Sequence, residues 1–154
     1  MKTVRILAVG RIKTPYWRDA AVHYKKRLSR SLKLEEVAIK DADPKLPLET
    51  RKELETARLF KLLLPQDISI CLDERGTGYT SSSFSALLRH LFEIGKRPCF
   101  LVGGAYGLAA IARATSAHCI SFGPMTLPHE LARIILFEQI YRAESIASGT
   151  GYHH

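Results

Sequence analysis

The sequence has few cysteines and no long apolar run. Its three cysteines lie far apart and lack the C-x-x-C spacing of zinc and redox sites. Cys71, Cys99 and Cys119 each fall within an apolar segment, which favours small buried side chains over metal ligands. No apolar run approaches the roughly 20 residues of a membrane-spanning helix. The opening MKTVRILAVGRIKTP shows no small-residue cleavage site and predicts a strand. We therefore expect a cytoplasmic protein with no bound metal and no membrane partner.

Acidic residues are scarce in the first part of the chain. Residues 1–66 carry 16 Lys and Arg against 8 Asp and Glu, whereas residues 67–154 carry 7 of each. The net charge of +8 therefore belongs to the first part. Eight cations lie between residues 11 and 33 against Asp19 alone: Arg11, Lys13, Arg18, Lys25, Lys26, Arg27, Arg30 and Lys33. Such density favours contact with a phosphate backbone, and the alternative is a solvated helix face.

Strand-like and helix-like segments alternate along the 154 residues. Apolar and β-branched segments predict strands at 3–9, 34–39, 67–72, 98–102 and 118–122. Helical spacing predicts helices at 15–29, 48–64, 84–94, 108–115 and 128–147. This alternation predicts an α/β sandwich, with one parallel sheet covered by helices on both faces. Because the chain shows no repeat or linker, we expect a single domain over residues 1–154.

Loops containing glycine follow three of the predicted strands, at 73–78, 103–107 and 123–128. The carboxyl ends of parallel strands meet at one edge of a sheet, where open α/β sheets bind ligands. The turn Gly103-Gly104-x-x-Gly107 does not match the G-x-G-x-x-G dinucleotide fingerprint, and the chain has no Walker or G-x-S-x-G motif. A plain β–α turn would use the same glycines, so the residues alone leave the ligand open.

The last predicted helix carries charges on an otherwise apolar stripe. Glu138 and Arg142 form an i, i+4 pair in the favourable order, beside Ile134, Ile135 and Tyr141. Charges in such surroundings must be paired or must face a site. An ordinary salt bridge and a functional site both satisfy this requirement.

Three motifs together resemble a known family. GGAYGL at 103–108, SFGPMTLPHELARIILFEQIYRA at 121–143 and the terminal Tyr152-His153 are similar to the bacterial ribosomal RNA large subunit methyltransferase H family of the SPOUT class. The resemblance extends over essentially the whole chain. It implies methyl transfer from S-adenosylmethionine to N3 of a pseudouridine in large-subunit (23S) ribosomal RNA. It also implies a homodimer, a trefoil knot in the C-terminal half, and a substrate that is the large subunit or the assembled ribosome.

The resemblance assigns residues to both halves of this reaction. Arg142, Tyr152 and His153 are placed on the substrate side. The residues placed against S-adenosylmethionine follow the three strands: Leu72, Asp73, Gly103, Gly104, Gly123, Pro124, Met125, Thr126, Leu127 and Pro128. One departure is visible at Ala105-Tyr106, where family members often have Pro-Glu.

The chemistry implied for the substrate side concerns one proton. A sulfonium methyl is already activated, so the protein must position the reactants and remove the proton from N3. Arg142 would stabilise the developing anion, while His153 or Tyr152 would assist deprotonation or position the base. Glu138 would orient Arg142 and is less favoured as the base. Because a three-residue tail is too short to build a pocket, the tail of one subunit would complete the site of the other.

Other functions are compatible with the same residues. The basic charge fits a non-catalytic RNA-binding or ribosome-assembly factor equally well. A Rossmann-type nucleotide enzyme is disfavoured by the missing fingerprint. A SPOUT methyltransferase acting on tRNA differs from the first hypothesis only in its substrate.

Overall fold

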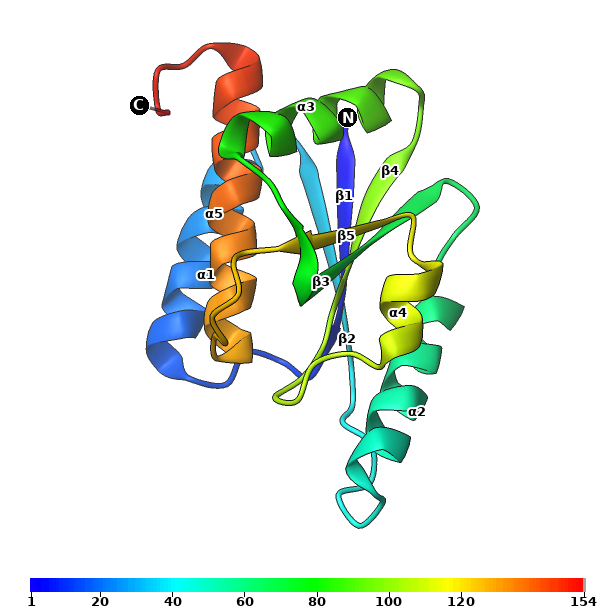
Figure 1. Cartoon of the computed structure of the whole chain (residues 1–154). Helices are drawn as coiled ribbons and strands as arrows, with labels where there is room; N and C mark the ends of the chain where they lie inside the picture. The colour runs from blue at the N-terminus through cyan, green and yellow to red at the C-terminus, as the bar shows by residue number, and fades with distance from the viewer. Residues whose placement is uncertain (154) are drawn as a thin grey trace.

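The computed structural model describes residues 1–153, which form a five-stranded sheet between two layers of helices (Figure 1). The strands are β1 (Thr3–Val9), β2 (Lys33–Ile39), β3 (Asp67–Gly78), β4 (Arg97–Val102) and β5 (His118–Ser121). The helices are α1 (Pro15–Leu28), α2 (Leu48–Lys61), α3 (Ser81–Glu93), α4 (Ala110–Thr115) and α5 (His129–Ser148). The strand order is β2-β1-β4-β3-β5 and every neighbouring pair is parallel, which confirms the predicted α/β class.

The two faces of the sheet carry separate apolar cores. Along β1, Ile6 and Ala8 belong to the core under α1, α3 and α5, whereas Leu7 and Val9 belong to the core under α2 and α4. Both faces of the inner strands are buried, which explains why these strands are nearly continuous apolar runs.

The three cysteines lie in or beside the second core as free thiols. Cys71 and Cys99 are buried and Cys119 is half-buried. Burial raises the pKa of both Cys71 and Cys99 to about 12. Among residues 1–153, no group of three or more His, Cys, Asp or Glu side chains is placed to hold a metal ion.

Strand β3 is longer than predicted, and this corrects the expected loop at 73–78. Leu72 and Thr77 both pair with Ile120 of β5, so the residues between them bulge out of the ladder and the strand then resumes. Strand β3 can pair again with β5 after the bulge only because residue 76 is glycine. A Cβ at Gly76 would lie 2.8 Å from the Cys119 sulfur and 2.9 Å from the Cys119 carbonyl carbon. Only glycine permits this close approach of the two strands.

The largest differences at helix boundaries from the sequence-based expectation are three residues, in α3 and in α2. Helix α3 begins at Ser81 rather than 84, because the Thr80 hydroxyl accepts the Ser83 backbone N–H at 3.0 Å and caps the helix. Helix α2 ends at Lys61 rather than 64. Its last turn is tightened by the bond from Leu62 N–H to the Leu59 carbonyl at 3.0 Å.

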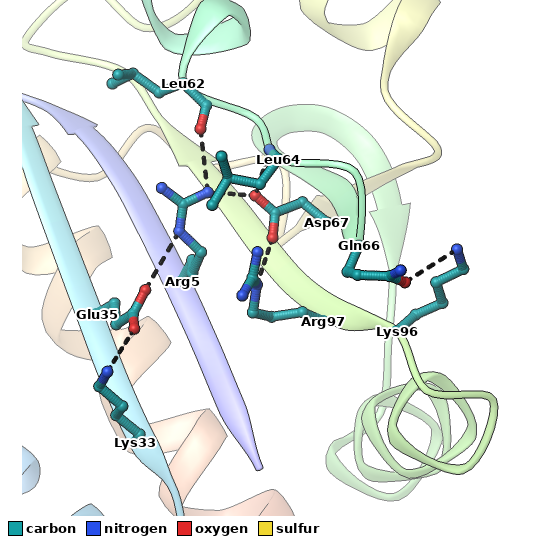
Figure 2. A network of polar contacts seen from close by, with 9 residues as sticks. All are labelled: Arg5, Lys33, Glu35, Leu62, Leu64, Gln66, Asp67, Lys96 and Arg97. Atoms are coloured by element: carbon teal, nitrogen blue, oxygen red, sulfur yellow. Dashed lines mark hydrogen bonds and ion pairs between the residues drawn. The ribbon is translucent and has the colours of Figure 1, made fainter. Parts of the chain in front are cut away.

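A charged network holds together the amino ends of the strands (Figure 2). Asp67 accepts hydrogen bonds from Arg97 Nε at 2.6 Å, from Leu64 N–H at 2.9 Å and from Arg5. Arg5 also donates to the Leu62 carbonyl at 3.1 Å. Burial opposes ionisation of Asp67, but these hydrogen bonds outweigh it and hold the pKa of its carboxyl below the ordinary value.

Helix α5 returns from the sheet edge to the middle of one face. Strand β5 is an edge strand, yet α5 packs between α1 and α3 (Figure 1). The buried Arg133 donates to the Gly10 carbonyl at 3.0 Å and so fixes α5 to the end of β1. This return of the chain is consistent with the trefoil knot that the resemblance implies. None of the helices in residues 1–153 is long and apolar enough to cross a membrane.

Candidate functional site

A cavity of about 400 Å³ lies at the carboxyl edge of the sheet, and we call it the donor cavity. Its volume falls within the range of small-molecule sites. Eight of the ten residues expected against S-adenosylmethionine line it: Leu72, Asp73, Gly103, Gly104, Gly123, Met125, Thr126 and Leu127. Pro124 and Pro128 belong to the same loop but do not line the cavity. The structure therefore brings the three strand-end segments together, as the topology predicts.

The glycine turn after β4 is closed on itself. The Gly107 N–H donates to the Gly104 carbonyl at 3.0 Å, and Gly107 adopts a positive φ of 80°. A Cβ on Gly103 would lie 2.5 Å from the carbonyl carbon of Gly107 and 2.8 Å from the Leu108 nitrogen. Both neighbours are backbone atoms, so this wall of the cavity requires glycine at position 103.

The loop after β5 is held against the bulge in β3. The Ser121 hydroxyl donates to the Glu74 carbonyl at 3.0 Å and accepts the Gly123 N–H at 2.9 Å. Farther along the loop, the Thr126 hydroxyl donates to the Glu74 carboxylate at 3.0 Å. Two segments far apart in sequence thus form one rigid wall of the donor cavity.

Sequence reasoning missed the cation that faces Asp73. Arg113 of α4 lies in the cavity wall and donates from Nη1 to Asp73 Oδ2 at 2.9 Å. The second carboxylate oxygen accepts the Arg75 N–H at 2.9 Å. The Asp73 carboxylate is therefore paired with a cation and held in one orientation. No local motif indicates this pair, because its members are 40 residues apart.

The four residues expected on the substrate side form one cluster, which we call the tail cluster. Glu138 Oε1 receives Arg142 Nε at 2.9 Å and Arg142 Nη2 at 2.8 Å. Glu138 Oε2 accepts the Tyr152 hydroxyl at 3.1 Å. Arg142 Nη1 lies 3.3 Å from His153 Nδ1, and the guanidinium carbon lies 4.7 Å from the centroid of the Tyr152 ring. Glu138 and Arg142 thus form a salt bridge that also contacts Tyr152 and His153.

Helix α1 supplies tail-cluster contacts that the sequence did not reveal. The guanidinium carbon of Arg27 lies 4.4 Å from the Tyr141 ring centroid and 5.4 Å from that of Tyr152. Burial, together with the nearby Glu138 carboxylate, raises the pKa of Tyr24 to about 12. Arg27 belongs to the basic stretch at 11–33, and its stacking on two tyrosines links Tyr152 of the tail to α1.

The donor cavity and the tail cluster lie at opposite ends of α5. Ala132 lines the cavity, whereas Arg142 lies ten residues farther along the helix. At about 1.5 Å per residue, this places the two roughly 15 Å apart along the axis. Figure 1 shows the red tail segment that follows α5 at the end of this helix that faces away from the loop preceding it. No tail-cluster residue lines the donor cavity of the same chain.

Comparison with known proteins settles the family. A family model described as a predicted SPOUT methyltransferase matches residues 1–153. The chain belongs to the SPOUT methyltransferase family. The matched residues include those that form the donor cavity and those that form the tail cluster.

Relatives within this SPOUT family are similar over their whole length. The ribosomal RNA large subunit methyltransferase H of Oleidesulfovibrio alaskensis is 48% identical over 155 residues, covering 100% of both chains. The protein of the same name from Nitratidesulfovibrio vulgaris strain Miyazaki F is 50% identical over 157 residues, again covering 100% of both. The crystal structure of a probable methyltransferase from Bordetella pertussis Tohama I shares the fold, with a TM-score of 0.57 at 14% identity. That match covers 93% of this chain and 94% of the other.

Proposed function

We propose that this SPOUT protein transfers the methyl group of S-adenosylmethionine to N3 of a pseudouridine in large-subunit ribosomal RNA. The observation that carries the proposal is the full-length similarity, at 48% and 50% identity, to two proteins named ribosomal RNA large subunit methyltransferase H. A cavity at the strand ends and a cation–tyrosine–histidine cluster formed by α5 and the tail after it supply groups suited to a donor and to an acceptor. A non-catalytic assembly factor would require neither.

The lining of the donor cavity fits S-adenosylmethionine chemically. Leu72, Leu108 and Leu127 offer apolar surface for an adenine ring, and the turn at Gly103 and Gly104 offers backbone peptide groups. The Glu74 carboxylate in the same wall suits a sulfonium or an amino group. When bound, S-adenosylmethionine supplies an activated methyl group, and the chain must hold the reactants and handle one proton.

The contacts within the tail cluster divide the roles of its members. Glu138 is held by Arg142 and by the Tyr152 hydroxyl, so it orients both and is poorly placed to act as a base. Burial and the hydrogen bond to Glu138 raise the pKa of Tyr152, which keeps its phenol protonated. We therefore assign proton removal from N3 to His153, because imidazole accepts protons near neutral pH. Arg142 stabilises the anion that develops on the base.

The separation along α5 requires two subunits for one site. A base that contacts Arg142 cannot reach a methyl group in the donor cavity of the same chain, roughly 15 Å away along the helix. A second cavity, of about 420 Å³, adjoins the donor cavity at Ile120, Phe122 and Gly123. Tyr79 and Ile135 also line it and offer an apolar surface to a partner. We assign this surface to a homodimer in which each tail cluster completes the donor cavity of the other subunit.

Mixed dimers test this arrangement. A Gly103→Ala chain carries a damaged donor cavity and an Arg142→Ala chain a damaged tail cluster. At S-adenosylmethionine concentrations below the wild-type Kd, the first homodimer should therefore be strongly impaired and the second inactive. In a one-to-one mixture, half of the dimers are mixed and each of these has one intact site of two, which gives about one quarter of wild-type activity. An inactive mixture, shown by mass spectrometry to contain mixed dimers, would place both halves in one chain and refute the shared site.

Two further measurements separate the competing functions. Calorimetry with S-adenosylmethionine should show binding, and no heat would favour the non-catalytic factor. Labelled methyl groups should enter large ribosomal subunits or whole ribosomes and not tRNA. Labelled tRNA with unlabelled ribosomes would identify the tRNA methyltransferase instead.

A further inference from the structure

A groove of about 910 Å³ lies beside the donor cavity, between the ends of β1 and β2 and the start of α2. We propose that this groove binds the RNA strand that flanks the target nucleotide, through phosphate contacts and one stacked base. The proposal rests on the proposed function and identifies where its substrate lies. Lys40, Arg51 and Arg58 are central to it, and none of the three belongs to the basic stretch at 11–33.

The groove shares a wall with the donor cavity. Five residues line both spaces: Lys52, Gly104, Ala105, Tyr106 and His129. The exposed tip of the glycine turn, Ala105-Tyr106, stands between the two. A strand lying in the groove therefore passes directly beside the methyl donor, as the neighbours of a target nucleotide must.

Backbone N–H groups engage three of the four acidic side chains that line the groove, namely Glu130, Glu55 and Asp43, and the fourth is Asp41. Glu130 accepts Lys13 N–H at 3.0 Å and Thr14 N–H at 3.3 Å. Although burial opposes ionisation of Glu130, these bonds keep the pKa of its carboxyl below the ordinary value. Glu55 accepts Ala42 N–H at 2.9 Å. These carboxylates shape the loops and do not neutralise the cations.

The cations around the groove are free to meet a ligand. Within residues 1–153, five of them have no carboxylate oxygen within 4.0 Å: Arg11, Lys13, Lys40, Arg51 and Arg58. Lys52 pairs with the exposed Glu49 at 3.5 Å. By contrast, Lys25 and Lys33 of the basic stretch pair with Glu36 and Glu35, and Arg27 stacks on tyrosines. Unpaired cations are the groups that phosphates recruit.

Tyr106 and Arg51 add a stacking surface at the shared wall. Tyr106 is 64% exposed, and the guanidinium carbon of Arg51 lies 5.5 Å from the centroid of its ring. Arg51 Nε is buried without a hydrogen-bond partner among the residues that the structure describes. An exposed aromatic ring beside a guanidinium donor suits an unstacked base and its phosphate in single-stranded RNA. This combination favours a looped RNA strand over a duplex.

The test removes two groove cations that do not line the donor cavity. Lys40→Gln/Arg58→Gln is compared with Lys61→Gln/Arg89→Gln, which removes one Lys and one Arg that line neither space. Methyl transfer to large ribosomal subunits is measured at several salt concentrations, with calorimetry on S-adenosylmethionine in parallel. For the groove variant, KM should rise at least tenfold with kcat and donor affinity unchanged. The slope of log KM against log salt should fall by roughly 1.4, about 0.7 for each phosphate that the variant no longer neutralises.

Two outcomes would overturn the proposal. One is a groove variant with the KM and salt slope of the wild type, and the other is an equal effect in the control variant. The second outcome would assign binding to net charge rather than to the groove. Failure of the proposed function is distinguishable from both, because the wild-type chain itself would then show no donor binding or no methyl transfer.

Discussion

The two adjacent glycines of the turn after β4 should respond differently to the same added methyl group. In Gly103→Ala, the new Cβ would lie 2.5 Å from the Gly107 carbonyl carbon, whereas ordinary contact begins near 3.4 Å. The turn must therefore move by about 0.9 Å, the difference between these distances. In Gly104→Ala, the nearest atom is Val9 Cγ1 at 3.3 Å, a side-chain end that yields by a tenth of an ångström. Neither glycine has a positive φ, so backbone strain does not enter the comparison.

The expected effect on the donor cavity follows from this geometry. Overpacking of this kind costs about 1–3 kcal/mol, and if the cost falls on the cavity-forming turn, donor affinity drops roughly 5- to 150-fold. Gly104→Ala should bind the donor within about twofold of the wild type, since its cost is near zero. Calorimetry with S-adenosylmethionine measures both affinities, and circular dichroism confirms that both variants fold. The reasoning is refuted if folded Gly103→Ala binds as tightly as Gly104→Ala.

Two further predictions concern the sheet and the tail cluster. Asp67→Asn removes the buried carboxylate from Arg5, leaves this guanidinium only the partly exposed Glu35 at 3.5 Å, and should cost about 3 kcal/mol in urea unfolding. The pKa of Asp67 is lower in the folded chain than in the unfolded one. Its contribution to the free energy of unfolding is therefore present above about pH 4 and is lost as the pH falls through the folded-state pKa. Asp67→Asn should lack this pH dependence. Tyr152→Phe should keep most of the kcat of methyl transfer, whereas His153→Asn should lower kcat by about 100-fold or more. The reverse pattern would make Tyr152 the base.

The general architecture could be predicted because it depends on local pattern. Strand β1 matches its expected bounds, and the inner strands are recognisable as apolar runs because both faces of each are buried. The three strand ends meet at one edge because parallel strands share a direction, so most of the donor cavity followed from Gly103, Gly123 and their neighbours. These inferences require only periodicity and the rule for parallel sheets.

Long-range contacts could not be predicted from the same patterns. The resumption of β3 after its bulge depends on Gly76 passing close to Cys119, and Arg113 meets Asp73 only through the fold. Arg27 stands in a basic stretch that resembles a nucleic-acid surface, yet its tyrosine partners come from α5 and the tail. Such pairings are set by tertiary packing, which a single sequence does not display.

The separation between the donor cavity and the tail cluster is already implicit in the sequence-based expectations. The resemblance places Leu127 and Pro128 against S-adenosylmethionine, and the helix predicted at 128–147 carries Arg142 away from them. The structure adds that Ala132 of the 20-residue helix α5 lines the cavity, whereas no tail-cluster residue does.

The most direct test of the central claim is nucleoside mass spectrometry of ribosomal RNA methylated by the purified chain. Large subunits or ribosomes from cells lacking the protein are incubated with the chain and isotopically labelled S-adenosylmethionine. The account predicts one labelled N3-methylpseudouridine per large-subunit RNA, absent when Arg142→Ala replaces the wild type. Label on another nucleoside, on tRNA, or on no RNA would contradict it.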